Sequence, residues 1–324
     1  MPYVPIIDIS NRDPDAVGAE LDEVCRTVGF FQITGHGIDD GIAMGAWTAA
    51  TRFFDLPLAD KLSVTRPAAD YPYGYIPVAG ESLSQSMAGA APPDLKEVFN
   101  IGPVTAPVHL LTDPDEASVY SPNLWPKALP ELQEAWTAYY AAMRDLGSRL
   151  MSLFARGLGL PPGFFDGKID QHPDALRAIN YPQRDDLPLP GQLRAGAHTD
   201  YGTLTILRQD AVGGLEVLDR SGNWADVESV PGAFVINIGD LMARWTNDQW
   251  HSTLHRVVDP PGEAPDRVRI ARARRQSMPY FQNANWSAEI ACLPTCLAPG
   301  EAPKYEPVLA GPHLMGKFRK SVSL

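Results

Sequence analysis

Apolar residues recur at helical spacing in several stretches of this 324-residue chain. After Asn11 and Asp13, either of which can cap a helix, an apolar stripe begins near Pro14 and stops at Gly29. Further helices are predicted over 39–55, 130–157 and 307–323. The last of these is expected to pack over the entrance of a cavity.

From about residue 175 onward the pattern changes to the short runs typical of β-strands. Turns rich in Gly, Pro, Ser and Asn separate these runs. The strand candidates are 204–207, 214–218, 224–227 and 233–238, preceded by one at 31–33. Short strands with closely spaced turns predict a jelly roll, a double-sheet architecture whose mouth can hold a metal. Residues 65–130 are rich in Pro, Gly, Ala and Ser, and we expect them to form mainly an ordered loop over a cleft.

Composition narrows the class of partner. The chain has 27 Lys and Arg against 39 Asp and Glu, a net charge of −12, which disfavours a nucleic-acid or anionic-membrane surface. No uninterrupted apolar stretch approaches the ~20 residues of a membrane span, and residues 1–5 lack the layout of a secretory signal. Cys25, Cys292 and Cys296 follow no zinc spacing and suit a reducing compartment. We expect a cytoplasmic protein, a monomer or small homo-oligomer, that acts on a small molecule.

Candidate chemistry centres on His198-Thr199-Asp200 and on His255, which follows much later in the sequence. In a strand, residues i and i+2 point to the same face, so His198 and Asp200 can reach one ion while Thr199 faces away. The third ligand, His255, must come from another strand brought alongside. Two histidines and one carboxylate leave three positions of an octahedral ion open, which is the ligand set typical of non-haem Fe(II) oxygenases.

A second set of residues is suited to bind a carboxylate. Arg275 and Ser277 stand at i and i+2, so both can face one cavity, and a guanidinium binds a carboxylate bidentately. Tyr181 adds a phenol that can donate to the same anion. A metal site beside a carboxylate receptor suits 2-oxoglutarate, with its keto-acid end on iron and its distal carboxylate at Arg275.

These residues also have simpler interpretations. His251 competes with His255, because two histidines four residues apart share one face of a helix. Asp200 can cap a turn, and Tyr181 can be a packed aromatic residue. Arg275 belongs to a basic run that alone would be a solvated face.

With these motifs in place, the chain resembles the isopenicillin N synthase-like group of Fe(II)/2-oxoglutarate-dependent dioxygenases. The resembling segments run nearly from end to end in the family's order. The resemblance favours His255 over His251, because His255 precedes Arg-Val-Val as the family's distal ligand does. The segments are 4–8, 29–38, 96–102, 197–202, 252–258 and 275–277.

The resemblance implies a mostly β fold with flanking α, whose core is the double-stranded β-helix form of the jelly roll. It predicts an N-terminal dioxygenase region over 1–120 and a supporting helical segment over 121–174. The jelly-roll core is expected over 175–285 and a C-terminal segment with a helix over 286–324. We expect these parts to form one compact unit.

The implied activity is an Fe(II)- and 2-oxoglutarate-dependent oxygenase that hydroxylates or desaturates a small molecule, while 2-oxoglutarate and O2 become succinate and CO2. Asp200 argues against halogenation, because related halogenases replace this carboxylate to admit chloride. Two alternatives stay open: an oxidase of the isopenicillin N synthase type that needs no 2-oxoglutarate, and a non-catalytic ligand-binding relative. The residues expected to line the substrate pocket are Tyr73, Tyr75, Tyr201 and Phe281.

Overall fold

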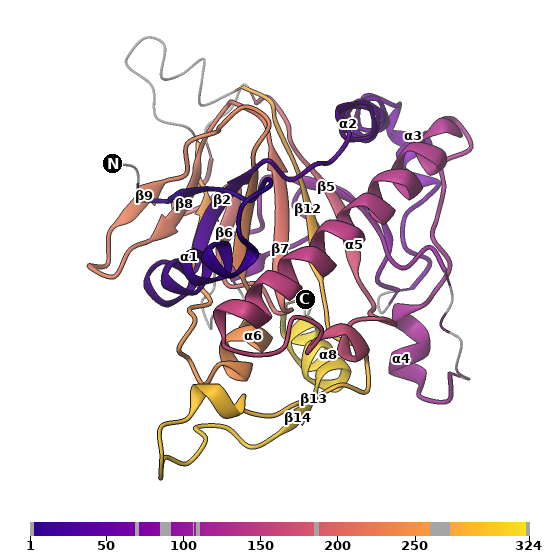
Figure 1. Ribbon diagram of the computed structural model, residues 1–324. Coiled ribbons are helices and arrows are strands. Elements are labelled where there is room, and N and C mark those ends of the chain that lie inside the picture. Colours follow the sequence, from indigo (N-terminus) through magenta and orange to yellow (C-terminus); the bar gives the residue numbers. More distant parts are fainter. Residues whose placement is uncertain are drawn as a thin grey trace.

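Two β-sheets form the frame of the protein (Figure 1). The computed structural model describes residues 3–68, 71–84, 92–105, 107, 111–184, 188–259 and 273–321. The large sheet consists, in spatial order, of β1 (Ile6–Asp8), β2 (Phe30–Thr34), β10 (Phe234–Ile238), β7 (Leu204–Gln209), β12 (Arg275–Gln282), β5 (Ala175–Tyr181), β4 (Glu97–Ile101) and β3 (Gly74–Ile76). The small sheet consists of β6 (Ala195–His198), β11 (His255–Val257), β8 (Leu215–Leu218) and β9 (Trp224–Asp226). This arrangement is the predicted double-sheet jelly roll.

Strand alternation gives the large sheet two different faces. In β12, Arg275, Ser277 and Phe281 line a cavity between the sheets. Met278 and Tyr280, at the intervening positions, belong to the main hydrophobic core on the other face. One face of the sheet therefore builds the core, and the opposite face is left for chemistry.

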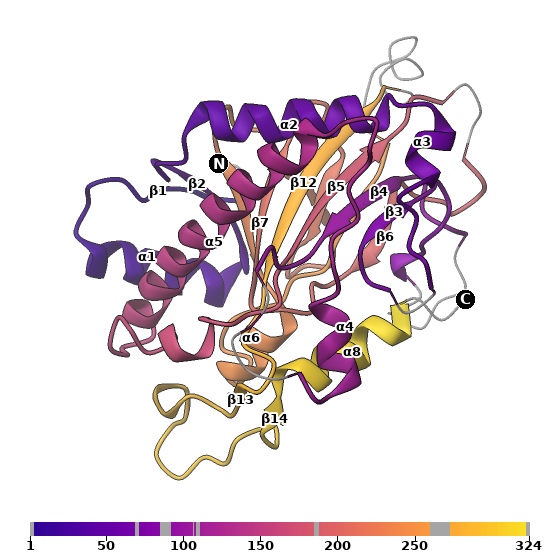
Figure 2. The same ribbon diagram turned by 90° about the vertical axis from the view of Figure 1, so that its right-hand side faces the viewer.

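Three helices cover the outer face of the large sheet. The long helix α5 (Glu131–Gly157) crosses it diagonally, flanked by α1 (Pro14–Thr27) and α2 (Asp40–Phe54) (Figures 1 and 2). Asp13 caps α1, and Gly29, at φ +69°, follows its end. All three helices are confirmed to within two residues. Burial of each large apolar side chain on the α5 stripe contributes about 1.5–3 kcal/mol.

The described part of 65–130 is mainly loop, as expected, but it also contains elements that the sequence analysis did not predict. β3 and β4 extend the large sheet, and α4 (Pro114–Val119) follows them. All of β4 is buried, including its polar residues, so no alternation in the sequence reveals the strand. The Glu97 carboxylate accepts hydrogen bonds from Lys61 Nζ at 2.9 Å and Asn180 Nδ2 at 2.8 Å, which allows the charge to be buried. Lys61 comes from the short helix α3 (Leu58–Leu62).

The C-terminal part closes one end of the sandwich. A short helix, α6 (Asp240–Trp245), precedes the second metal-ligand segment, and β13 (Glu289–Ile290) pairs with β14 (Val308–Leu309). The last helix, α8 (Ala310–Ser321), begins at Ala310 rather than at residue 307, and residues 322–323 of the prediction lie outside the described residues. Its Leu314, Met315 and Phe318 line the cavity. Two short 3-10 helices cover Asp166–Lys168 and Pro294–Cys296.

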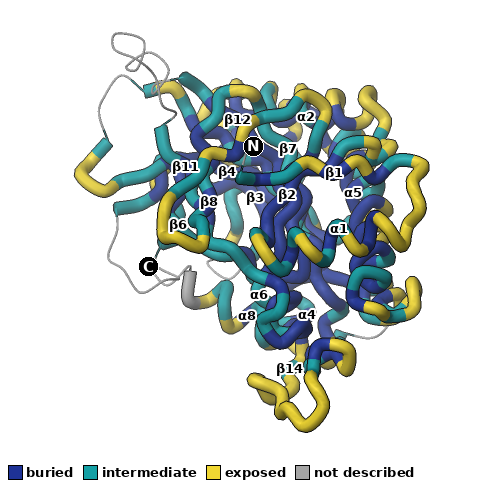
Figure 3. The backbone as a smooth tube through the Cα atoms, turned by 60° about the vertical axis from the view of Figure 1, so that its left-hand side comes forward, coloured by how far each residue is buried: buried dark blue, intermediate teal, exposed yellow. Residues whose placement is uncertain are grey.

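Buried residues concentrate in the strands and on the inward sides of the helices, and exposed residues gather at the loops (Figure 3). A second, smaller apolar cluster lies between the two sheets and includes Phe30, Tyr181 and Val217. Within the ranges given above, no helix has both the length and the apolar character needed to cross a membrane.

Candidate metal centre

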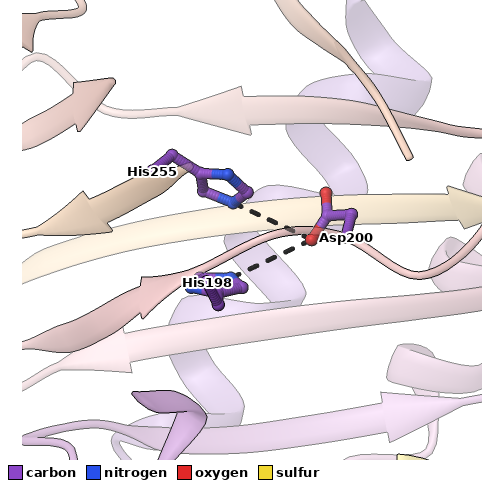
Figure 4. Close-up of side chains that lie close together, drawn as sticks. All are labelled: His198, Asp200 and His255. Atoms are coloured by element: carbon purple, nitrogen blue, oxygen red, sulfur yellow. Dashed lines mark ion pairs between the residues drawn. The ribbon is translucent and has the colours of Figure 1, made fainter. Parts of the chain in front are cut away.

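The three predicted metal ligands converge in the structure (Figure 4). His198, at the end of β6, and His255, at the start of β11, are register partners in the antiparallel pair, and their ring centroids lie 4.3 Å apart. Asp200 Oδ1 lies 3.9 Å from His198 Nε2 and 3.8 Å from His255 Nε2. The candidate ligand atoms all lie within 4.8 Å of one another, close enough to reach one ion.

Asp200 does not lie on a strand as predicted, because β6 ends at His198. Hydrogen bonds in the following loop aim its carboxylate instead. Asp240 N–H donates to the Asp200 carbonyl oxygen at 2.8 Å, and Asn237 Nδ2 donates to Asp200 Oδ2 at 2.6 Å. The Thr205 hydroxyl also donates to Oδ2. Oδ1 is therefore left to face the two imidazoles.

The protonation states of the site suit a cation. His198 Nδ1 lies 2.7 Å from the Gly196 carbonyl oxygen, and His255 Nδ1 lies 3.1 Å from that of Thr253, so each Nε2 keeps its lone pair for a metal. Burial, and then the charge of His255, lower the pKa of His198 to about 3. Burial would raise the pKa of Asp200, but His255, His198 and the two hydrogen bonds to Oδ2 together lower it.

Asp240 connects the metal-bearing segments with the C-terminal helix. Its Oδ1 accepts a hydrogen bond from Ser252 Oγ at 2.7 Å, and its Oδ2 accepts one from Thr199 Oγ1 at 3.3 Å. Lys317 Nζ, from α8, donates to Oδ2 at 2.9 Å. Sequence reasoning missed this residue because its partners lie up to 77 positions away.

The predicted carboxylate receptor lies on the wall of the same cavity. The Arg275 side chain is buried, with the residue 1% exposed, and its guanidinium carbon lies 5.0 Å from the centroid of the Tyr181 ring. Arg275 Nη2 donates to Gln209 Oε1 at 2.9 Å, whereas Nε and Nη1 have no acceptor among the described residues. Buried donors are rarely left unpaired, so Arg275 has donor capacity left for the carboxylate of a ligand. Ser277 lines the cavity on the same strand face.

The cavity measures about 240 Å³ and is lined from both sheets and from α8. Of the four residues predicted for the substrate, Tyr73, Tyr201 and Phe281 line it. Tyr75 is not among the described lining residues: it is buried in the main core, and its hydroxyl donates to Glu97. Gly74, at φ +105°, is the first residue of β3, so Tyr73 precedes the strand and Tyr75 lies within it, which accounts for their different surroundings.

The competing histidine lies elsewhere. His251 Nε2 accepts a hydrogen bond from Arg220 Nη2 at 2.7 Å, and the residue is not among the described residues that line the cavity. Charged residues that the sequence analysis did not single out do line it, among them Glu81, Lys96 and Arg177. Arg177 lies on the same strand face as Tyr181, so alternation along β5 is a signal that could have identified it.

Comparison with known proteins agrees with this geometry. Residues 4–128 match the family model described as non-haem dioxygenase in morphine synthesis N-terminal, and residues 173–284 match the 2OG-Fe(II) oxygenase superfamily. The 2-oxoglutarate-Fe(II) type oxidoreductase hxnY of Emericella nidulans is 35% identical over 93% of this chain and 84% of its own. The validamycin A dioxygenase of Streptomyces hygroscopicus is 36% identical over 90% of this chain and 79% of its own.

Solved structures show the same fold. A full-length Neurospora crassa protein in complex with alpha-KG and thymine has a TM-score of 0.84 at 29% identity, covering 99% of this chain and 97% of its own. A putative 2OG-Fe(II) oxygenase family protein from Caulobacter crescentus has a TM-score of 0.85 at 29% identity, covering 99% of both chains. The predicted jelly roll, cofactor pair and class of activity are thereby confirmed. The chain belongs to the 2OG-Fe(II) oxygenase superfamily.

Proposed function

We propose that His198, Asp200 and His255 hold the Fe(II) ion, and that Arg275 and Ser277 hold the distal carboxylate of 2-oxoglutarate. The observation that carries this assignment is the buried Arg275 guanidinium, whose two N–H groups lack an acceptor among the described residues, on the cavity that also contains the triad. Bound iron supplies the oxidising chemistry that couples decarboxylation of 2-oxoglutarate to oxidation of a C–H bond.

The protein's own residues bind and orient the reactants. The Tyr181 ring supports the Arg275 guanidinium by a cation–π contact, so it fixes the direction in which the fork points. Phe30 packs against the His255 imidazole with ring centroids 5.4 Å apart and limits its rotation. The two sheets enclose the oxidation site on both sides, which limits the access of water to it.

We further propose that Tyr73, Tyr201 and Phe281 contact a small-molecule substrate. All three line the cavity, and the Tyr201 hydroxyl is buried with no hydrogen-bond partner in the described part of the chain. The thymine held by the Neurospora crassa relative supports a compact polar substrate for this chain as well. The outcome we favour is hydroxylation at one C–H-bearing carbon, or desaturation across two adjacent ones.

The proposal is tested by Fe(II)-dependent conversion of 2-oxoglutarate to succinate during a screen of small molecules. We expect His255→Ala to abolish both iron binding and succinate formation. His251→Ala is the matched control, since this histidine bonds Arg220 away from the cavity, and it should retain both. Equal loss in the two variants would contradict the ligand assignment, and oxygen consumption without succinate would indicate an oxidase that needs no 2-oxoglutarate.

A further inference from the structure

One carboxylate on the cavity wall has an oxygen without a hydrogen-bond partner. The Glu81 side chain is 9% exposed and lines the cavity. Its Oε1 accepts a hydrogen bond from Arg177 Nη2 at 2.6 Å. Its Oε2 is buried and accepts none from the residues that the structure describes. Lys96 Nζ lies 3.8 Å from Oε2, beyond hydrogen-bond distance, so the acceptor is available to a ligand.

Hydrogen bonds connect Glu81 to the strand that carries the first histidine. The Glu81 carbonyl oxygen accepts from Asp94 N–H at 2.9 Å, and Asp94 Oδ1 accepts from Gly196 N–H at 2.9 Å. Gly196 in turn accepts from His198 Nδ1 at 2.7 Å. A Cβ atom at Gly196 would lie 2.9 Å from Ser84 Cβ, so the glycine permits this close approach. The free oxygen therefore belongs to a segment fixed against the metal strand.

The charges around this oxygen decide which donor it accepts. Burial opposes ionisation of Glu81, but Arg177 and Lys96 outweigh it and lower its pKa, so Oε2 acts only as an acceptor. Arg177 and Lys96 already compensate the negative charges of Glu81 and of Asp94 behind it. Oε2 therefore carries no unbalanced negative charge that would favour an ammonium group over an uncharged donor.

We propose that Glu81 is a specificity-determining residue whose Oε2 binds an uncharged N–H or O–H group of the substrate. The substrate is then a hydroxyl-, amide- or lactam-bearing small molecule, held by this group at one end and presenting a C–H bond to the metal centre. Its apolar part lies against Ile76, Ile179 and Phe318, which line the same cavity. This inference rests on the proposed function.

Paired fragments on the Fe(II)- and 2-oxoglutarate-loaded protein test the inference under anaerobic conditions. The probes are 2-pyrrolidinone with N-methyl-2-pyrrolidinone, cyclohexanol with its methyl ether, and cyclohexylammonium. Perturbation of the visible iron–2-oxoglutarate band reports binding of each fragment. We expect each donor to bind about tenfold more tightly than its methylated partner, because methylation leaves the buried oxygen unpaired.

The Glu81→Gln variant should lose that preference. Its amide oxygen would stay with Arg177, so its NH2 group would replace Oε2 and meet the donor of the fragment. Glu216→Gln is the matched control, because Glu216 pairs with Arg256 Nε at the same 2.6 Å but does not belong to the described cavity wall. It should keep the wild-type preference.

The outcomes separate this inference from the proposed function. A wild-type protein that holds iron but forms no band would contradict the proposed function itself. Three results with a normal band would overturn the inference and leave Oε2 to water. In the first, donors and their methylated partners bind equally; in the second, no donor binds. In the third, Glu81→Gln keeps the wild-type preference. Tighter binding of cyclohexylammonium than of cyclohexanol would contradict the inference that Oε2 prefers an uncharged donor.

Discussion

At the residue scale, the direction of the Asp200 carboxylate depends on two neighbours rather than on its place in the sequence. Asn237 and Thr205 both donate to Oδ2, so Oδ1 alone faces the histidines. Partners of this kind orient a metal ligand and are often as important as the ligand itself.

We predict that Asn237→Ala weakens Fe(II) binding by about 10–100-fold, the usual effect of removing a hydrogen-bond partner of a metal ligand. Anaerobic Fe(II) titration measures it. Asn223→Ala, in an exposed turn, serves as the control and should bind like the wild type. Wild-type affinity in Asn237→Ala would show that the Thr205 bond alone aims the carboxylate.

The sequence predicted which of the site residues lie together: Arg275 and Ser277 stand at strand spacing, and the family resemblance selected His255 over His251. It could not predict how Asp200 is aimed, since that depends on long-range partners. It misplaced Tyr75, because β3 begins at Gly74 and its alternation does not extend back to Tyr73. Glu81 and Asp240 escaped notice because only the folded chain brings their partners to them.

At the scale of elements, two backbone segments cross closely beneath the metal centre. Gly239 follows β10, and a Cβ atom added there would lie 2.2 Å from the Gly202 carbonyl oxygen. Backbone hydrogen bonds hold the crossing, with Gly239 N–H donating to Thr203 O at 3.0 Å and Leu241 N–H to Gly202 O at 3.1 Å. The loop that carries Asp200 therefore depends on a glycine in the next element.

We predict that Gly239→Ala lowers the free energy of unfolding by about 1–3 kcal/mol, because backbone must move to admit the methyl group. Gly239→Ala should also weaken Fe(II) binding, because the loop that carries Asp200 would shift. Gly45→Ala in α2 is the control: a Cβ there meets no atom of the described chain within 4 Å, and helix propensity should raise stability. Thermal unfolding with and without Fe(II) measures both effects.

The strand that the sequence analysis missed provides a prediction of its own. Removing the Lys61 amine would leave the Glu97 carboxylate of β4 without its charged partner, 2.9 Å away. We expect Lys61→Ala to lower the free energy of unfolding by about 3–5 kcal/mol, and the Lys61→Met/Glu97→Gln double variant to recover much of that loss. Urea denaturation measures it. A double variant no more stable than Lys61→Ala would show that the charge is not the cause.

At the scale of the whole molecule, the fold separates packing from chemistry. α1, α2 and α5 cover one face of the large sheet, while the other face and the small sheet enclose the cavity, with α8 at its rim (Figures 1 and 2). The helices α1, α2, α5 and α8 followed from their apolar stripes, and the sandwich from short strand runs separated by turns, whereas β3, β4 and α4 did not. The four-part division of the chain, the cytoplasmic location and the small oligomeric state stay predictions.

The central claim is most directly tested by anaerobic titration of the Fe(II)-loaded protein with 2-oxoglutarate, followed by the visible metal-to-ligand charge-transfer band. We predict a saturable band in the wild type and far weaker binding in Arg275→Leu, a loss of about 2–5 kcal/mol for a buried carboxylate without its charged partner. Arg274→Leu is the control. Arg274 Nη1 donates to Asp55 Oδ1 at 2.5 Å, and Arg274 is not among the described residues that line the cavity. No band in iron-loaded wild-type protein, or an Arg275→Leu titration that matches the wild type, would contradict the account.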